Sequence, residues 1–232
     1  MQLQEWLDNL QYLFNEDSGK DVLKLKGEDY KYLFKVRRHD VDDVLYFRSK
    51  NKSQELYKYK VLFIDAKSAS LELLSSEIKE VGAKKEFHLA WCVIDPKSVE
   101  KVLPSLNEIG VTKITFIYCE RSQKNYKVDL KRYERILETS SQQCGRSTDM
   151  KFEIVKNIST FLQEHKDVSV LDFCDNVLDK EDDIKIALIG CEGGFSETER
   201  GLLKSLNNFR LDTPMILRSE SAAVAIASKV VL

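Results

Sequence analysis

The sequence lacks the features that mark membrane and secreted proteins. In its 232 residues no apolar run approaches the ~18 residues that a membrane-spanning helix requires. The first residues, MQLQEWLDNLQYLF, include acidic side chains where a secretory signal has a basic flank and a pure apolar stretch. Internal repeats and low-complexity tracts are also absent. With 43% hydrophobic and 32% charged residues, we expect a globular cytoplasmic protein with one large domain or two smaller ones.

Cysteine is present, but without the spacing that metal and redox motifs need. No two of the five cysteines have the CxxC separation. Several lie inside apolar runs, where a thiol behaves as a small hydrophobic side chain. We therefore expect neither a disulfide nor a metal site. The five are Cys92, Cys119, Cys144, Cys174 and Cys191.

Two glycine-rich nucleotide motifs are missing as well. A dinucleotide site needs GxGxxG after the first strand of its unit, and a P-loop needs GxxxxGK followed by Ser or Thr, and neither occurs here. Instead, three glycines gather in LIGCEGGFSETE, residues 188–199, directly after a largely apolar run. Glycines allow a backbone to approach a ligand closely. Because Glu192 lies among them and would repel a pyrophosphate, a cationic or zwitterionic ligand fits better.

The same stretch also has a purely local interpretation. Ser196 and Glu199, three residues apart, have the pattern of a capping box at the start of a helix. That pattern explains the two polar residues, but it gives no reason for Gly190, Gly193 and Gly194 to lie together. We therefore favour ligand binding. We expect a valine at Gly193 to fill the space of the ligand and to be barred from the backbone conformation required there.

Two different sequence patterns follow one another along the chain. Up to Gly82, short β-like runs alternate with polar turns, which predicts a small β-barrel. From Phe87, strand-like runs alternate with helical stretches, which predicts an α/β region with a parallel sheet. We expect the polar segment 78–85 to separate the two parts, and residues 215–232 to form a short strand that passes into an alanine-rich helix. The strand-like runs begin at Val22, Asp43, Tyr57, Ala69, Phe87, Lys113, Val168 and Ile184, and the helical stretches cover 97–110 and 129–146.

Charge is distributed unevenly, although the formal net charge is only -2. Residues 21–60 are rich in Lys and Arg, and such a region can meet a polyanion even in a nearly neutral chain. A solvated surface with scattered lysines explains the same composition, so charge alone leaves both interpretations open. The basic residues of this segment include Lys24, Lys26, Lys31, Lys35, Arg37, Arg38, Arg48, Lys50 and Lys52.

Several short motifs, taken in order, resemble one family. IGCEGGFSETE is similar to the GPEGG-type loop, and ILRSESAA to the ILRTETA-type loop, of the ribosomal RNA small-subunit methyltransferase E family, which are uridine N3-methyltransferases of the SPOUT superfamily. The resemblance covers most of the chain. Residues 1–9 precede it as an extension or a start-site artefact. The other similar stretches are YLFKVRR at 32–38, LNEIGV at 106–111, ERS at 120–122 and QQCGRS at 142–147.

The resemblance implies a fold and an activity that composition does not reveal. It implies a PUA-like β-barrel that binds RNA over residues 1–80, followed over 81–232 by a SPOUT methyltransferase domain with a parallel sheet and a trefoil knot. It also implies a homodimer that uses S-adenosyl-L-methionine to methylate a uridine N3 in small-subunit (16S) ribosomal RNA, free or assembled. The alternatives are a SPOUT enzyme acting on transfer RNA or on a ribose 2′-hydroxyl, and a non-catalytic RNA-binding module with a decayed donor pocket.

Two segments of backbone are expected to hold the methyl donor. Cys191 stands in the first of them where the family usually has proline, and Thr213 and Met215 replace a glycine and an arginine before ILR. Lys31 and Tyr32 occupy an expected histidine pair, which bears more on the RNA substrate than on the donor. The donor-binding residues that the resemblance implies are Leu188, Ile189, Gly190, Glu192, Gly193, Gly194, Met215, Ile216, Leu217 and Ser221.

Methyl transfer to a uridine N3 sets requirements on the residues beside the donor. A sulfonium methyl is already activated, so the protein chiefly aligns donor and acceptor, and no metal is required. N3 must lose a proton, and a cation that faces the ring carbonyls would favour the resulting anion. Arg218 is the first candidate for this cation, with Glu220 or Glu192 as the proton acceptor. A structural ion pair between Arg218 and one of these glutamates is the alternative.

Arginines are the candidates for contact with RNA phosphates. The resemblance assigns this role to Arg37 and Arg38 in the barrel, and to Arg121 and Arg146 in the catalytic domain. Without such a resemblance, a pair of surface arginines is more often exposed to solvent alone than in contact with nucleic acid.

The histidines are weak candidates for a catalytic base. His88 lies inside an apolar strand and His165 lies near a helix end. We therefore assign no base role to either of them or to the third histidine, His39.

Overall fold

A computed structural model describes residues 11–179 and 182–232, so the expectation for residues 1–9 lies outside the described residues. The chain divides into two compact units. The first comprises residues up to Gly82 together with Ser141–Thr148, and the second comprises Ala83–Ser140 and Asp149–Leu232. Each unit has its own hydrophobic core.

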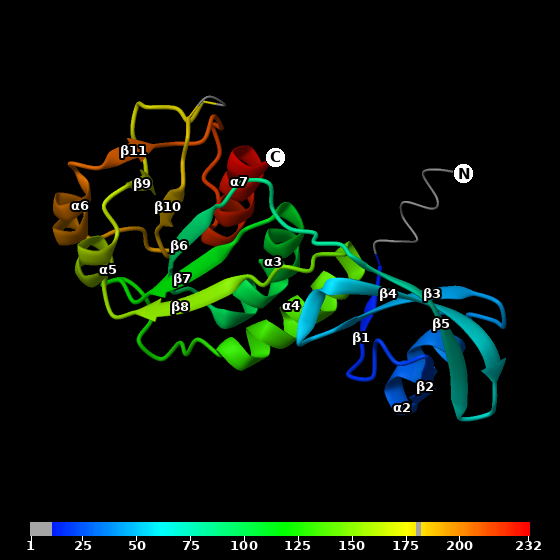
Figure 1. The fold of residues 1–232 in the computed structure, drawn as a ribbon. Coiled ribbons are helices and arrows are strands. Elements are labelled where there is room, and N and C mark those ends of the chain that lie inside the picture. The colour runs from blue at the N-terminus through cyan, green and yellow to red at the C-terminus, as the bar shows by residue number, and fades with distance from the viewer. Residues whose placement is uncertain (1–10, 180–181) are drawn as a thin grey trace. The chain divides into compact units, whose positions relative to one another are not determined.

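The first unit is built on a five-stranded sheet with the hydrogen-bonded order β1-β3-β4-β5-β2 (Figure 1). Its neighbours pair antiparallel except β1 and β3, which pair parallel. Strand β2 shows why the sheet forms, because Leu23 and Leu25 are buried while Lys24 and Lys26 on the alternate face are exposed. The strands are β1 (Leu13–Phe14), β2 (Val22–Lys26), β3 (Val44–Ser49), β4 (Lys52–Ile64) and β5 (Ser68–Ile78).

A short helical segment, which sequence patterns did not indicate, follows β2. Helix α2 (Gly27–Tyr30) continues into the π-helix η1 (Lys31–Val36), and Leu33 and Phe34 from η1 are buried in the core of the first unit. In the loop after η1, Arg37 caps the helix and Arg38 lies in the left-handed region, at φ 62. This conformation turns the chain back towards β3.

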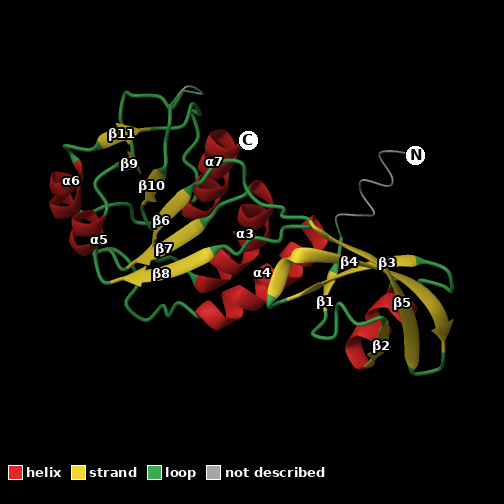
Figure 2. Ribbon diagram, in the orientation of Figure 1, coloured by secondary structure: helices red, strands yellow, loops and turns green. Residues whose placement is uncertain are grey.

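The second unit contains a six-stranded sheet with the order β11-β9-β10-β6-β7-β8, and all its neighbouring strands pair parallel (Figure 2). The prediction of an α/β region with a parallel sheet is thereby confirmed. The central strand β6 is almost wholly buried, because it has neighbours on both sides and helices against its faces. The strands are β6 (His88–Cys92), β7 (Lys113–Ile117), β8 (Lys151–Val155), β9 (Val168–Leu171), β10 (Ile186–Ile189) and β11 (Asn207–Phe209).

Five described helices accompany this sheet. Figure 1 shows α3, α4 and α7 gathered on one side of it, with α5 and α6 lying away from them. The first and last of these helices, α3 and α7, pack against each other. The helices are α3 (Pro96–Ile109), α4 (Leu130–Cys144), α5 (Ile158–Glu164), α6 (Glu197–Leu203) and α7 (Ser219–Val231).

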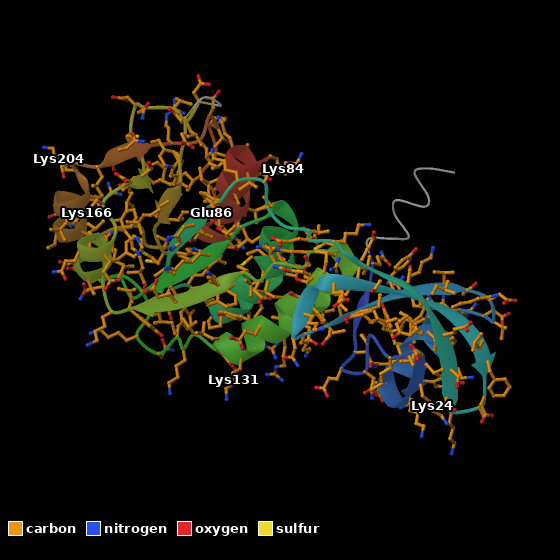
Figure 3. All side chains as sticks on the ribbon, viewed as in Figure 1. Lys24, Lys84, Glu86, Lys131, Lys166 and Lys204 are labelled. Carbon is orange, nitrogen blue, oxygen red and sulfur yellow. The ribbon has the colours of Figure 1, made fainter. Side chains whose placement is uncertain are left out.

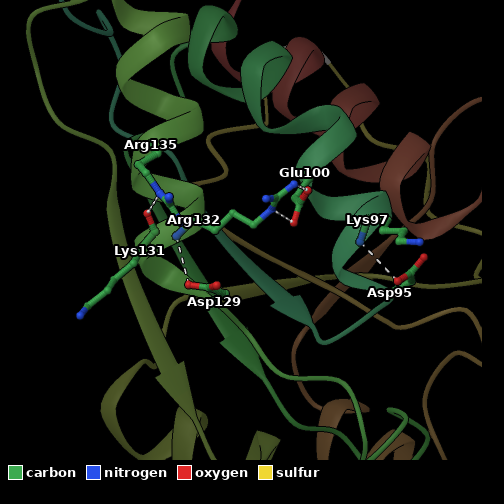
Figure 4. Close-up of polar contacts among 7 residues, drawn as sticks. All are labelled: Asp95, Lys97, Glu100, Asp129, Lys131, Arg132 and Arg135. Carbon is green, nitrogen blue, oxygen red and sulfur yellow. Dashed lines mark hydrogen bonds and ion pairs between the residues drawn. The ribbon is translucent and has the colours of Figure 1, made fainter.

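Local signals in the sequence explain where α3 begins and ends. A side-chain contact also holds it to α4. The Asp95 side chain accepts the backbone N–H of Lys97 at 3.3 Å, and Pro96 takes the first helical position (Figure 4). Gly110, at φ 109, ends the helix in the left-handed region. Arg132 of α4 donates two hydrogen bonds to the Glu100 carboxylate of α3, one of them 2.7 Å long.

The predicted strand at the start of residues 215–232 is wrong. Residues 213–218 form an irregular loop, and helix α7 begins at Ser219. The apolar pair Met215 and Ile216 suggested a strand, but a strand needs a pairing partner, and both side chains are exposed, at 69% and 83%. Strands β8 and β11 were also not anticipated, whereas α5 ends next to His165, as expected.

The surface of the second unit is charged. Lys131, Lys166 and Lys204 extend into solvent from α4, from the end of α5 and from the end of α6 (Figure 3). In the part of the chain that the structure describes, no helix is both long and apolar enough to cross a membrane.

Candidate functional site

The candidate site lies where three loops of the second unit meet. In the sheet order, β6 continues to β7 and β8 on one side, whereas β10, β9 and β11 lie on its other side. The boundary between β6 and β10 is therefore a topological switch point, and the carboxyl ends of parallel strands at such a point form a binding crevice. We name the loops the glycine loop (residues 190–196, after β10), the arginine loop (118–122, after β7) and the terminal loop (213–218, before α7).

The shape of the glycine loop explains two of its three glycines. A β-carbon on Gly190 would lie 3.3 Å from the Cα of Gly194, so the two residues pack backbone against backbone. Gly194 also has φ 67, which residues with side chains rarely adopt, and its N–H donates to the carbonyl of Cys191 at 2.8 Å. Turn geometry therefore accounts for Gly190 and Gly194.

Gly193 is different, and one expectation about it is wrong. Its φ does not lie in the left-handed region, so its backbone conformation does not exclude a valine. A β-carbon there would meet only the Arg121 side chain, at 3.4 Å. Gly193 is exposed. Turn geometry therefore does not account for Gly193, whose missing side chain leaves space above the loop beside Arg121.

The predicted capping box is confirmed, and it also joins two of the loops. The Ser196 hydroxyl accepts the N–H of Glu199, and the Glu199 carboxylate accepts the N–H of Ser196 at 2.9 Å. The second oxygen of the buried Glu199 carboxylate accepts the N–H of Glu120 in the arginine loop at 2.8 Å. One carboxylate therefore holds the glycine and arginine loops together.

Arg121 belongs to this site as well. Its guanidinium donates from Nη1 to the carbonyl of Gly193 at 2.7 Å. The side chain is exposed on its other side. Because a guanidinium has five N–H donors, Arg121 can hold the glycine loop and still contact an anion.

A buried hydrogen-bond relay ties the glycine loop to α7. The indole N–H of Trp91 donates to the Ser219 hydroxyl at 2.8 Å, and that hydroxyl donates to the carbonyl of Gly190 at 2.6 Å. Trp91 and Ser219 are both buried. Sequence patterns did not single out either residue. The one signal in the sequence was that Ser219 follows ILR, next to the candidate catalytic arginine.

Arg218 and Glu220 lie at the start of α7, beside this relay. Arg218 is the N-cap residue and is exposed, and within the described residues its side chain forms no hydrogen bond or ion pair. The alternative of a structural ion pair with Glu192 or Glu220 is thus not realised. Glu192 is exposed, and its carboxylate only approaches the N–H of Asp95, at 3.5 Å. Both acidic groups and the arginine remain available to a substrate.

The other candidate donor residues are distributed between interior and surface. Leu188 and Ile189 are buried in β10, so only their backbone can face a ligand. Leu217 packs against the core, and Ser221 is exposed on the first turn of α7. Within the described residues the backbone N–H groups of Ile216 and Leu217 have no hydrogen-bond acceptor. The terminal loop thus offers two backbone hydrogen-bond donors to a ligand.

The candidate RNA-binding arginines fall into two groups. Arg37 and Arg38 are exposed, and Arg37 lies over the Tyr32 ring, 5.4 Å from its centroid, while donating to its hydroxyl at 3.0 Å. Arg146, by contrast, is 4% exposed, donates to the carbonyl of Thr148 at 2.9 Å and groups with the first unit. Its assignment to an RNA surface of the catalytic domain is therefore wrong.

The basic segment of the first unit contains a second buried arginine. Arg48 is 1% exposed, with its guanidinium 4.9 Å from the centre of the Tyr12 ring and one N–H donating to the carbonyl of Ser53. Arg48 therefore stabilises the first unit internally and adds nothing to its basic surface.

The histidines lie outside the three loops. His88 is the first residue of β6, at the amino end of the sheet, and its ring hydrogen-bonds the Thr115 hydroxyl at 2.7 Å. Burial, and next the charge of Lys113, lower the pKa of His88 to about 4. His165 stacks edge-on against His88, and His39 of the first unit pairs with Asp43. None of them reaches the candidate site.

Sequence comparisons relate the chain to known methyltransferases. The family model described as an RNA methyltransferase domain matches residues 82–231. The chain is 40% identical, over 223 residues, to the ribosomal RNA small subunit methyltransferase E of Helicobacter pylori (strain ATCC 700392 / 26695). That alignment spans 94% of this chain and 98% of the relative.

Solved structures show the same fold. A protein from Legionella pneumophila, in complex with the bound cofactor SAM, has a TM-score of 0.74 and 22% identity, and the match covers 95% of each chain. The ribosomal RNA small subunit methyltransferase E from Neisseria gonorrhoeae, bound to S-adenosyl methionine, has a TM-score of 0.72 and 16% identity, covering 94% of this chain and 96% of that one. At such identities the likeness establishes the α/β fold and not the ligand.

Proposed function

The chain belongs to the ribosomal RNA small subunit methyltransferase E family, and we propose that it transfers a methyl group from S-adenosylmethionine to N3 of a uridine in small-subunit (16S) ribosomal RNA. The observation that carries this proposal is the arrangement of the three loops. An exposed arginine without a protein partner among the described residues stands at the start of α7, and Ser219 hydrogen-bonds directly from there to the glycine loop.

Finer features of the fold are part of the proposal. We propose that residues 1–80 act as a PUA-like RNA-binding barrel, and that residues 81–232 form a SPOUT methyltransferase domain with a trefoil knot. The enzyme would act in the cytoplasm as a homodimer. The side chains of Met215 and Ile216 are apolar and exposed, which supports a contact of the terminal loop with either S-adenosylmethionine or a second copy of the chain. Light scattering on the purified chain tests the dimer.

The residues of the site fit S-adenosylmethionine, which supplies an activated sulfonium methyl group when bound. The uncovered surface at Gly193 leaves room for it, and the N–H groups of Ile216 and Leu217 can donate to a purine ring. Glu192 places a negative charge near this space, which suits a sulfonium and an α-amino group better than a phosphate. The groups that would hold S-adenosylmethionine are thus mainly backbone groups, which agrees with the glycines of the glycine loop.

Arg218 and Glu220 account for the chemistry at uridine. A guanidinium facing the uracil carbonyls stabilises the anion that forms when N3 loses its proton. Because Arg218 has no ion pair within the described residues, its positive charge is not already neutralised by the protein. Glu220, in the first turn of α7, can accept the N3 proton. Alignment of N3 with the methyl group supplies the remainder of the rate enhancement.

The exposed arginines support binding of RNA. Arg37 and Tyr32 present a cation and an aromatic ring on the same surface of the first unit, which is a combination that contacts phosphate and stacks on an unpaired base. Lys24 and Lys26 are exposed on β2 in the same unit. Arg121 would contribute from the arginine loop of the second unit.

A binding measurement separates the proposed enzyme from an RNA-binding module that has lost its donor pocket. We expect isothermal calorimetry of the purified chain with S-adenosylmethionine to give a saturable heat with one donor per chain. A matched titration with adenosine, which lacks the amino-acid part, should bind more weakly because it cannot use the charge of Glu192. If neither compound gives heat while the chain still binds ribosomal RNA, the enzyme proposal is wrong and the binding module is correct.

A further inference from the structure

Three cysteines gather beneath the loops of the candidate site, although their sequence spacing suggested no connection. The Sγ atoms of Cys119 in the arginine loop and Cys191 in the glycine loop lie 3.5 Å apart. Cys92, at the end of β6, is fully buried, and its thiol is close enough to affect the pKa of Cys119. Within the described residues no group of Cys, His, Asp or Glu is arranged to hold a metal ion.

We propose that Cys119 and Cys191 form a reversible disulfide under oxidising conditions and that this bond switches off the donor site. All five cysteines are reduced in this structure. An S–S bond is about 2.0 Å long, so the two sulfurs need to approach each other by roughly 1.5 Å. Both belong to loops rather than strands, where such a shift meets least resistance.

Cys119 has the surroundings of a reactive thiol. It lines a cavity of about 490 Å³ between the arginine loop, the residues after β8 and the start of α6, and Lys124 and Lys156 line the same cavity. A small oxidant can thus reach the cavity wall at Cys119, where the two lysines stand beside the acidic Glu120 and Glu199. Hydrogen bonding with Cys191, and next with Cys92 and Ser122, lowers the pKa of Cys119, and the same pairing with Cys119 raises the pKa of Cys191. Cys119 is therefore the attacking sulfur.

With hydrogen peroxide as the oxidant, the reaction balances in two steps. The Cys119 thiolate attacks one peroxide oxygen, the O–O bond breaks, and hydroxide leaves and takes up a proton to give water and a sulfenic acid. The Cys191 sulfur then attacks the Cys119 sulfur, the S–O bond breaks, and hydroxide leaves with the Cys191 proton as a second water. Two thiols and one peroxide thus give one disulfide and two waters, and a thiol reductant reverses the bond.

The position of Cys191 explains why the bond would act on the donor site. Cys191 follows Gly190, whose carbonyl is held by Ser219 and whose Cα packs so closely on Gly194 that an added β-carbon would lie 3.3 Å from the Gly194 Cα. A pull on Cys191 towards the arginine loop therefore displaces the glycine loop as a whole and not Cys191 alone. Shifts of about 1 Å in a positioning element are enough to lower activity strongly. The effect on the donor rests on the proposed function, whereas formation of the bond does not.

The bond can be detected independently of activity. The full-length chain is treated with hydrogen peroxide, its free thiols are capped with N-ethylmaleimide, and it is digested with trypsin under non-reducing conditions. We expect a cross-linked peptide pair, residues 114–121 joined to 186–200, which disappears after dithiothreitol. Cys119→Ser should abolish it, while the matched control Cys174→Ser should not. If this pair is absent, or if Cys92 is the partner instead, the assignment is overturned.

The consequence for the donor is measured on the same samples. We expect the oxidised chain to bind S-adenosylmethionine about tenfold more weakly or worse, with recovery on reduction. Cys119→Ser should bind the donor normally before and after peroxide. A cross-linked chain with unchanged affinity would overturn the switch. If the reduced chain does not bind the donor at all, the proposed function fails, and the cross-link still decides whether the two thiols form the bond.

Discussion

The two ends of the parallel sheet use their polar side chains in opposite ways. Near the amino ends, His88 donates to the Thr115 hydroxyl, which donates to Glu153 at 3.0 Å, and Glu153 pairs with Lys113 at 2.6 Å. Each of these four side chains has a protein partner. At the carboxyl ends, Glu199 and Ser219 hold the glycine loop in place, but Arg218 has no partner within the described residues. A closed network stabilises the fold, whereas an exposed arginine on a rigid support is available for chemistry.

The largest effect is expected in the glycine loop. Gly194→Val should abolish donor binding and also lower stability, because valine is strained at φ 67. Gly193→Val should abolish donor binding while the chain stays as stable as wild type, because its backbone is unstrained and the new side chain meets only the flexible, exposed Arg121. Calorimetry with S-adenosylmethionine and thermal unfolding of both variants check this. Normal affinity in Gly193→Val would show that the donor does not lie over the loop.

Arg218→Ala should lower turnover by about a hundredfold, with much smaller changes in affinity for donor or RNA. Removal of one preorganised electrostatic interaction typically costs about 3 kcal/mol in the transition state. Lys should restore only part of the rate, because an ammonium cannot contact two carbonyls at fixed geometry. Single-turnover assays at saturating donor and RNA measure this effect. Near-normal turnover with weakened binding would reassign Arg218 to substrate docking.

The amino-end network should affect stability and not turnover. The pKa of His88 is lowered to about 4, so between pH ~6.5 and 4 the unfolded chain binds the extra proton. The free energy of unfolding should therefore decrease as pH falls through this range, with roughly 1–3 kcal/mol due to His88. Above pH ~6.5 this contribution is fully present.

Substitution of His88 tests that assignment. Urea unfolding of His88→Gln at pH 7 and pH 4.5 should show a smaller loss of stability than wild type, while His39→Gln in the first unit keeps the full loss. Turnover of His88→Gln at pH 7 should be unchanged. A large loss of turnover would mean that the two ends of the sheet are coupled and that the contrast between them is wrong.

The smallest effect is expected on the surface of the first unit. Replacing Arg37 and Arg38 by alanine should weaken RNA binding and reduce the slope of log affinity against log salt by roughly 0.7 to 0.9 for each phosphate that the protein no longer neutralises. Donor affinity should not change. Filter binding across a series of salt concentrations measures the slope. An unchanged slope would show that these arginines do not face RNA.

Local patterns predicted the elements that depend on local interactions. The capping box at Ser196 and Glu199 and the alternation of strands and helices from Phe87 are both found in the structure. The terminal loop was mistaken for a strand because apolar composition does not reveal whether a pairing partner exists. The family resemblance, and not periodicity, pointed to the region of the site around Arg218.

Contacts between distant residues could not be predicted from the sequence. The hydrogen bond from Trp91 to Ser219 joins residues 128 positions apart, and the thiols of Cys119 and Cys191 meet from loops 72 positions apart. Arg146 was assigned to the RNA surface from its motif alone. A matching motif does not show whether the arginine in it is buried. Such contacts depend on which strands are neighbours in the sheet, and only the fold supplies that information.

One measurement tests the central claim, that the carboxyl ends of this sheet form a uridine N3-methyltransferase site for small-subunit ribosomal RNA. Purified chain and S-adenosylmethionine are incubated with small-subunit ribosomal RNA, with assembled small subunits and with transfer RNA from a strain lacking the corresponding gene, and the digested nucleosides are analysed by mass spectrometry. We predict 3-methyluridine in ribosomal RNA, free or assembled, and almost none with Arg218→Ala. A 2′-O-methyl product, methylation confined to transfer RNA, or full product with Arg218→Ala would contradict the claim.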